Sequence, residues 1–210
     1  MGGIPHMVYQ FKNFINQRRS AMFKRFVIVV GVILMVTLPC NANAASYQKK
    51  IQKYVKSHVR GWLASQELID AVAQQNINHM GLTGNDINNL DQRWRTEKRL
   101  GGGDLMNSKM SNQLSAFLRG IKAASGGVIV EIFVMDNLGL NVGQTDPTGD
   151  YMQGDEAKWK KTYPVSANAV FIDEVEEDGG KNVSQTSLTV ALSNGARLGA
   201  ITVVIDVDKL

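Results

Sequence analysis

The chain has 210 residues and one cysteine, and its 23 lysines and arginines stand against 19 aspartates and glutamates. Residues 1–44 hold five basic residues, no acidic ones and the single Cys40, which leaves 18 basic against 19 acidic residues in the remainder. The remainder therefore gives no support for nucleic-acid binding, and it folds without disulfides, thiolate metal sites or a cysteine nucleophile.

Residues 22–44 have the pattern of a secretory signal peptide. Lys24 and Arg25 precede an apolar run over residues 26–38, and Ala42-Asn43-Ala44 offers a small-residue cleavage site. Thirteen helical residues cover only about 20 Å, which is too short for a hydrocarbon core of about 30 Å. We expect cleavage after Ala44 and a periplasmic protein.

Two alternatives for this leader are open. An uncleaved anchor in the inner membrane would leave residues 1–25 inside the cell, in agreement with the positive-inside rule. A lipoprotein on Cys40 is disfavoured because Pro39 stands where a small residue is expected. Residues 1–21 resemble neither a domain nor a signal.

The first segment after the leader has helical spacing. The pattern predicts one helix of about thirty residues, about 45–50 Å long, or two helices broken near Gly61. A single rod of that length would extend beyond a compact domain of this size, so we expect a homodimer or a docking surface. The apolar positions that set the spacing are Ile51, Tyr54, Val55, His58, Trp62, Ile69, Val72 and Ile77.

Two further helices follow. The spacing of apolar residues predicts one over residues 86–99 and another over residues 108–123, which Gly126 and Gly127 end. The run GGGD at residues 101–104 is a flexible break. It is not a phosphate loop, because no strand precedes it and no Gly-Lys-Ser/Thr follows it.

After Gly127 the period of the apolar residues changes to two, as in strands. Helices followed by an antiparallel sheet predict an α+β fold. Residues 45–122 hold 12 basic and 6 acidic residues and residues 123–210 hold 6 and 13, so the two parts should attract one another, within a chain or across a dimer. The predicted strands are residues 128–136, 140–145, 169–178, 184–192 and 197–207.

Several motifs together resemble one family, the extracytoplasmic Cache domains, whose fold resembles a PAS domain and which serve bacterial receptors as sensors. The motifs are LDQRW (90–94), IFVMDNLGLNVGQT (132–145), DYMQGDEAKWKKTY (150–163), VFIDEV (170–175) and LGAITVVIDV (198–207). The resemblance covers residues 45–210 as a single Cache-like domain, with a helical part at 45–122 and a PAS-like sheet at 123–210.

The resemblance implies a five-stranded antiparallel sheet on a long helix, with a small-molecule pocket between the sheet and a covering segment. The stretch DPTGDYMQGDEAKW (146–159) occupies that segment. We expect an organic acid, an amino acid or an amine as the ligand. The candidate ligand-binding residues are Arg93, Trp94, Asp150, Tyr151, Gln153, Asp155, Trp159 and Asp173.

Structural roles compete with these assignments. Asp155 suits the N-cap of a helix over residues 156–163, with Trp159 in the core. Arg93 lies four residues before Glu97 on a helix and suits a surface ion pair, as an alternative to gripping a ligand carboxylate.

Other functions have weaker support. A calcium loop does not fit, because Asp146, Asp150 and Asp155 lie four and five residues apart. Asp155 and Glu156, as neighbours on a helix, point about 100° apart and cannot flank one bond, so we expect no enzyme, cofactor or metal. His58 and His79 are expected to be structural.

A sensor that ends at Leu210 has to pass its signal to a separate protein, such as a membrane receptor or kinase. The alternative is an envelope scaffold protein that works through the long helix at residues 46–79.

Overall fold

The computed structural model describes residues 42–210, with side chains from residue 46 onward. The chain divides into two compact units, and the second, Asn41–Leu210, contains every element described below. The predicted leader and its alternatives, apart from the last three residues, lie outside the described residues. Among the described helices none is long and apolar enough to cross a membrane.

The first helical segment is shorter than a rod of thirty residues. Helix α2 (Ala42–Tyr54) continues through the π-helical turn η1 (Val55–Val59) into α3 (Arg60–Trp62), and α4 (Gln66–Asn78) follows a break. Ser65 is extended, with φ −68° and ψ 139°. The alternative of two helices is therefore correct, and the first spans only about 31 Å at 1.5 Å per residue.

Helix α5 (Gly84–Arg99) begins at a capping box, in which the side chains of Thr83 and Asp86 each bond the other residue's backbone N–H. The prediction of one helix over residues 108–123 is wrong. Two helices, α6 (Asp104–Met110) and α7 (Gln113–Ala124), meet at Asn112, whose side chain accepts a hydrogen bond from Ser115 N at 2.8 Å. This N-cap starts α7 in a new direction.

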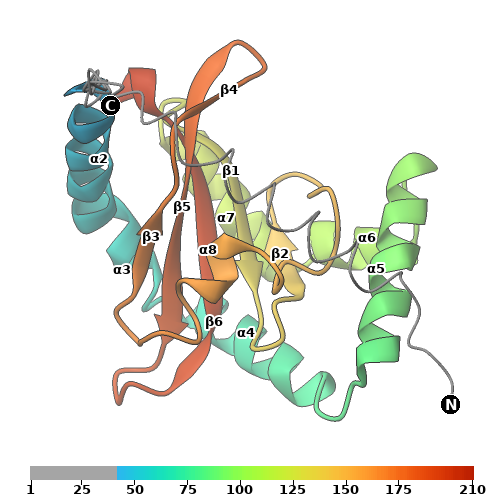
Figure 1. The fold of residues 1–210 in the computed structure, drawn as a ribbon. Helices are drawn as coiled ribbons and strands as arrows, with labels where there is room; N and C mark the ends of the chain where they lie inside the picture. The colour runs from blue at the N-terminus through green and yellow to red at the C-terminus, as the bar shows by residue number, and fades with distance from the viewer. Residues whose placement is uncertain (1–41) are drawn as a thin grey trace, which may run out of the picture. The chain divides into compact units, whose positions relative to one another are not determined.

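The sheet is antiparallel, with strand order β2-β1-β6-β5-β3, and β4 pairs with β5 (Figure 1). The strand predicted at residues 169–178 is divided into β3 and β4. The α+β fold with a PAS-like sheet is confirmed. The strands are β1 (Ile129–Met135), β2 (Asn141–Gln144), β3 (Val170–Ile172), β4 (Glu176–Asp178), β5 (Lys181–Ala191) and β6 (Arg197–Asp206), and the short helices α8 (Ala157–Lys160) and η2 (Val207–Lys209) complete the fold.

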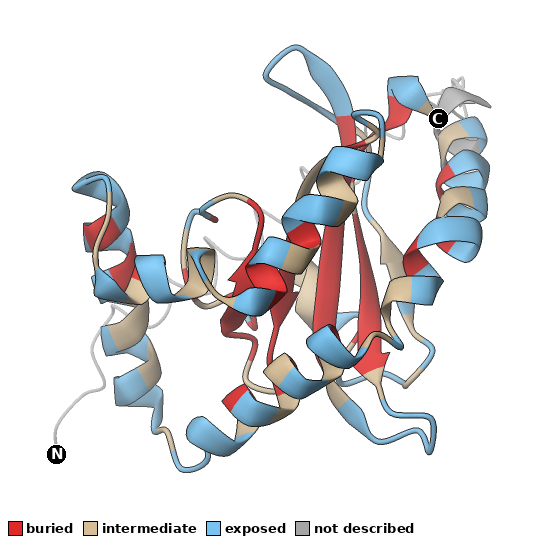
Figure 2. Ribbon diagram, turned by 180° about the vertical axis from the view of Figure 1, so that it is seen from behind, coloured by how far each residue is buried: buried red, intermediate tan, exposed pale blue. Residues whose placement is uncertain are grey.

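One face of the sheet carries the main core. Figure 2 shows α4 and α7 crossing in front of buried strands. Strand residues such as Ile132, Val134, Ile201 and Val203 pack there against apolar residues of α2, η1, α4 and α7. Burying these aliphatic side chains supplies most of the driving force for folding, at about 1.5–3 kcal/mol each.

The opposite side of the sheet, called the outer face below, is formed by alternate residues of β1, β6 and β5. Phe133, Met135 and Ala200 form a second apolar cluster there, against Trp159 and Tyr163. A β-bulge between Ile129 and Glu131 keeps Ile129 in the main core while Glu131 lies on the outer face.

Candidate functional site

The covering segment, residues 146–163, divides into two parts with different neighbours. Its first part packs against α5. Trp94 Nε1 donates to Thr148 O at 3.1 Å, and the Trp94 ring stacks on Tyr151 with 5.6 Å between ring centroids. Both side chains are fully buried. These two aromatic residues therefore fasten the segment to α5.

Polar contacts complete this attachment. Asp91 Oδ1 accepts hydrogen bonds from the backbone N–H groups of Tyr151 and Met152, at 2.9 and 3.1 Å. Arg95 Nη2 lies 2.9 Å from Asp150 Oδ2. Burial raises the pKa of the Asp150 carboxyl, and Arg95 opposes that change. Gln153 is buried and donates to Asp150 O at 3.0 Å, so these groups are satisfied within the protein.

The second part of the covering segment packs on the outer face. Trp159 Nε1 donates to Asp136 O at 3.2 Å, and its ring centroid lies 5.1 Å from that of Tyr163. Lys158 Nζ lies 5.1 Å from the centroid of the Phe133 ring. In Figure 1, α8 lies in front of the sheet.

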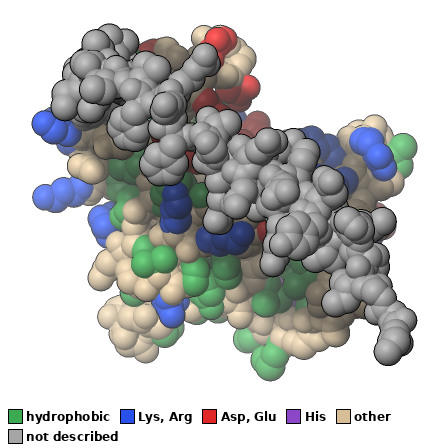
Figure 3. Space-filling view, viewed as in Figure 1, with side chains coloured by type: hydrophobic (Ala, Val, Ile, Leu, Met, Phe, Trp, Pro, Cys, Tyr) green, Lys and Arg blue, Asp and Glu red, His purple; other side chains and the backbone are tan. Residues whose placement is uncertain are grey.

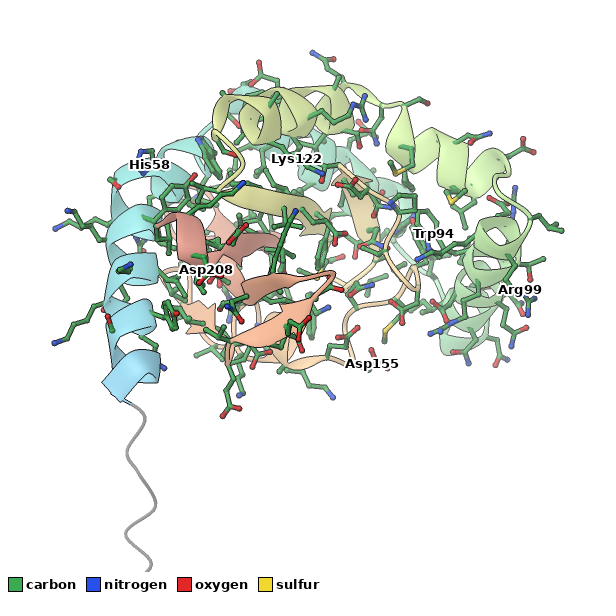
Figure 4. All side chains as sticks on the ribbon, turned by 90° about the horizontal axis from the view of Figure 1, so that it is seen from above. His58, Trp94, Arg99, Lys122, Asp155 and Asp208 are labelled. Atoms are coloured by element: carbon green, nitrogen blue, oxygen red, sulfur yellow. The ribbon has the colours of Figure 1, made fainter. Side chains whose placement is uncertain are left out.

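Asp155 does not cap this helix. The N-cap position of α8 is Glu156, without a side-chain cap bond, and the helix ends at Lys160. The expected N-cap role and the expected helix over residues 156–163 are therefore wrong. Asp155 is exposed, and Figure 4 shows it apart from Trp94.

The side chains of the outer face form rows across β1, β6 and β5. The first row is Glu131–Val204–Gln185, the second is Phe133–Thr202–Ser187 and the third is Met135–Ala200–Thr189. The covering segment packs on the second and third rows. The first row is polar at both ends and apolar in the middle.

The first row contains two buried acceptors that lack donors. Glu131 Oε1 and Gln185 Oε1 are buried and have no hydrogen-bond partner among residues 42–210. Their Cα atoms lie two strand spacings apart, about 10 Å. A buried acceptor without a donor costs about 1–3 kcal/mol, so this row is a candidate site for a ligand that donates hydrogen bonds.

A cavity of about 590 Å³ lies at this end of the sheet. Its lining includes Glu131, Asp146 and three lysines, Lys122, Lys181 and Lys209. Lys122 Nζ lies 2.6 Å from Asp146 Oδ2, whereas Lys181 and Lys209 form no ion pair within the described part of the chain. Figure 4 shows Lys122 on α7. The cavity thus offers both an acid and two available ammonium groups.

The charge of Glu131 depends on pH in the neutral range. Burial, together with the nearby Asp146, raises the pKa of the Glu131 carboxyl to about 7, while Lys158 and Lys122 act in the opposite direction. The carboxyl is therefore an ion above neutral pH and a neutral acid below it. Among the described residues, no group of three or more His, Cys, Asp or Glu side chains is placed to hold a metal ion.

The eight candidate ligand-binding residues are not brought together. Trp159 and Asp173 lie at the outer face, and Asp173 N donates to Gln185 O at 2.9 Å, beside the first row. Arg93 Nε pairs with Glu97 Oε1 at 2.6 Å on α5, as the alternative predicts, although Glu97 is buried and the pair is therefore only half on the surface. Trp94, Asp150, Tyr151 and Gln153 fasten the covering segment, and Asp155 faces solvent.

Sequence reasoning missed Glu131 and Gln185. Glu131 is the single charged residue within the apolar run VIVEIFVM, and a lone acid in a buried strand is a recognisable signal. Gln185, Ser187 and Thr189 alternate with Thr186, Leu188 and Val190, which marks a polar stripe on one side of β5. That the two strands put these groups into one row depends on strand order, which the sequence does not display.

Comparison with known proteins gives structural likenesses only. No family model and no curated sequence matches the chain. The sensor domain of the V. cholerae histidine kinase DctB is 10% identical, with 94% of this chain and 57% of that chain covered and a TM-score of 0.41. The ligand-binding domain of the Campylobacter jejuni chemoreceptor Tlp3, in complex with 4-methylisoleucine, is 13% identical, covers 80% and 58%, and has a TM-score of 0.37.

The sensor domain of E. coli DcuS is 12% identical, covers 60% of this chain and 89% of its own, and has a TM-score of 0.34. The chain spans little more than half the length of the DctB and Tlp3 structures. All three are sensor or ligand-binding domains. At these TM-scores the likeness supports no inference of function, which has to come from the site itself.

Proposed function

We propose that this protein is a Cache-type sensor domain that binds a small molecule carrying a primary ammonium group over the first row of the outer face. The observation that carries the proposal is the pair of buried acceptors without donors, Glu131 Oε1 and Gln185 Oε1, in one row. An ammonium group has three donors and no acceptor, so its hydrogen-bonding chemistry matches that of two acceptor oxygens.

The charged residues that line the cavity restrict the class of ligand. Lys181 and Lys209 line it without a carboxylate partner among the described residues, so a ligand carboxylate finds two ammonium groups there. Of the organic acids, amino acids and amines expected from the sequence, an amino acid uses both kinds of group. An organic acid alone would leave Glu131 and Gln185 without donors.

The signal-peptide pattern of residues 22–44 supports a periplasmic location for the domain. There the domain would pass the bound state to a separate membrane receptor or kinase. The covering segment borders the cavity through Asp146, and it contacts the second and third rows of the outer face through Trp159 and α5 through Tyr151.

A thermal-shift screen at pH 8 tests the ligand class. We expect amino acids to raise the melting temperature, since a ligand at 100 times its Kd stabilises by about 2.7 kcal/mol. Carboxylic acids that match these amino acids but lack the amine should leave the melting temperature unchanged. Glu131→Gln should reduce the affinity at least tenfold, and Glu177→Gln, on the exposed β4, is the matched control.

A broad set of amino acids and amines that leaves the melting temperature unchanged would contradict the proposal. So would binding that Glu131→Gln leaves intact, because the ligand would then lie elsewhere.

A further inference from the structure

A second cavity lies on the helical side of the sheet. It is a groove of about 830 Å³ between α4 and the α6–α7 pair. Leu114 and Val142 provide an apolar floor. Side-chain amides dominate the walls: Gln66, Gln74, Gln75, Asn78, Asn112 and Gln113.

Some of these amides leave groups for a ligand, whereas Gln75 and Asn112 are already hydrogen-bonded within the protein. Gln74 Nε2 donates to Asn78 Oδ1 at 3.1 Å, which keeps the Gln74 oxygen and the Asn78 amide hydrogens available. Gln113 is exposed and has no side-chain hydrogen bond within the described part of the chain. Carboxamides both donate and accept, as do the N–H and C=O groups of a peptide backbone.

A partly buried cation, Lys109, lies toward the Gln75 end of the groove. Lys109 Nζ donates to Gln75 Oε1 at 2.6 Å and lies 5.8 Å from the centroid of the Tyr151 ring. It forms no ion pair with any described residue. Burial lowers the pKa of Lys109, and the charge of Asp136 opposes this. The Tyr151 hydroxyl is also buried without a partner among residues 42–210.

The other end of the groove is acidic. Glu67 and Asp70 line it on the first two turns of α4, and both are exposed. Glu67 and Gln75, the contact of Lys109, are eight residues apart, about 12 Å along a helix. An extended chain covers about 3.3 Å per residue, so this distance fits three or four residues.

We infer that this groove binds a short peptide of three or four residues, extended along α4 with its carboxylate on Lys109 and its ammonium group near Glu67 and Asp70. The site is separate from the outer face and goes beyond the proposed function. Ends of opposite charge and a wall of amides select the peptide by its backbone and termini, so its side chains matter little.

Calorimetric titration of the protein with trialanine tests this inference. We expect trialanine to bind, and its C-terminal amide to bind at least tenfold more weakly, because the amide removes the charge that faces Lys109. Lys109→Met should cause the same loss for trialanine. Lys53→Met, on the exposed side of α2, should cause none.

A variant at the rim avoids any effect on folding. Glu67→Lys should weaken trialanine binding several-fold and leave N-acetylated trialanine unchanged, because the acetyl group removes the charge that Glu67 faces. Binding that survives Lys109→Met overturns the inference, as does the absence of heat at millimolar trialanine. Trialanine binding that is lost in Glu131→Gln but kept in Lys109→Met would place the peptide on the outer face and also overturn it.

Discussion

Glu131 is a partly buried charged residue in the middle of strand β1, and its pKa makes the cost of its charge depend on pH. The carboxyl has a pKa of about 7 in the folded protein and about 4.5 when unfolded. Between these values the folded state binds more protons than the unfolded state. The free energy of unfolding therefore falls as pH rises from about 4.5 to 7, and it stays low above that range.

Glu131→Gln should remove this dependence. We expect the substitution to stabilise the protein at pH 8 by up to about 3 kcal/mol, at about 1.4 kcal/mol per pKa unit, and to have little effect at pH 4.5. Urea unfolding at both pH values measures the difference. Equal losses between pH 4.5 and 8 in the wild type and in Glu131→Gln would show that another group is responsible.

Two glycines with similar positive φ angles differ in their surroundings. Gly139, with φ +80°, lies so close to the covering segment that an added Cβ would come within 2.3 Å of Gly154 Cα. Gly195, with φ +86°, has nothing within 4 Å. Gly195→Ala should cost about 1 kcal/mol, from the left-handed backbone alone.

Gly139→Ala should cost about 2 kcal/mol more than Gly195→Ala, since backbone atoms of the covering segment have to move. Urea unfolding of the two variants measures this difference. Equal costs would mean that the turn and the covering segment are not packed as described.

At the scale of elements, the junctions between helices give a matched pair of N-caps. Asn112 accepts from Ser115 N and donates to Val142 O, both at 2.8 Å, so it starts α7 and ties it to β2. Ser65 starts α4 without a side-chain cap bond. We expect Asn112→Ala to lower the free energy of unfolding by about 1–2 kcal/mol and Ser65→Ala to change it by less than about 0.5. Equal effects in chemical unfolding would contradict the assignment.

The same helix junctions show which features of the fold the sequence could predict. Periodicity located every long helix and strand, because apolar spacing is a local property. It joined α6 to α7, since Met110 and Leu114 keep helical spacing across the Asn112 cap. The resemblance to Cache domains placed Tyr151 and Trp159 together in one pocket, whereas Tyr151 packs on α5 and Trp159 on the sheet. Partners across 50 residues or more are set by tertiary packing, which local spacing does not contain.

At the scale of the whole molecule, the homodimer was expected because a single rod of about thirty residues would extend beyond the domain. The described helices do not form such a rod. The apolar stripe of α2 and η1, with Ile51, Val55 and Val59, is already buried in the main core. The exposed residues of this segment that carry a charge at neutral pH are all basic: Lys49, Lys50, Lys53 and Lys56. Exposed acids gather at the β4–β5 hairpin, at Glu176, Glu177 and Asp178. Figure 3 shows the basic side chains along α2 and acidic ones near that hairpin.

Self-association should therefore be electrostatic and sensitive to salt. Opposite charges on two copies attract across about 30 Å at 0.01 M salt but across less than about 10 Å above 0.1 M. We expect sedimentation velocity to show association at 0.01 M salt and a monomer at 0.3 M, and Lys49→Glu with Lys53→Glu to remove the association at low salt. A dimer that persists at 0.3 M salt in both proteins would require an apolar interface, and α2 has none left to offer because its apolar residues already pack against the sheet.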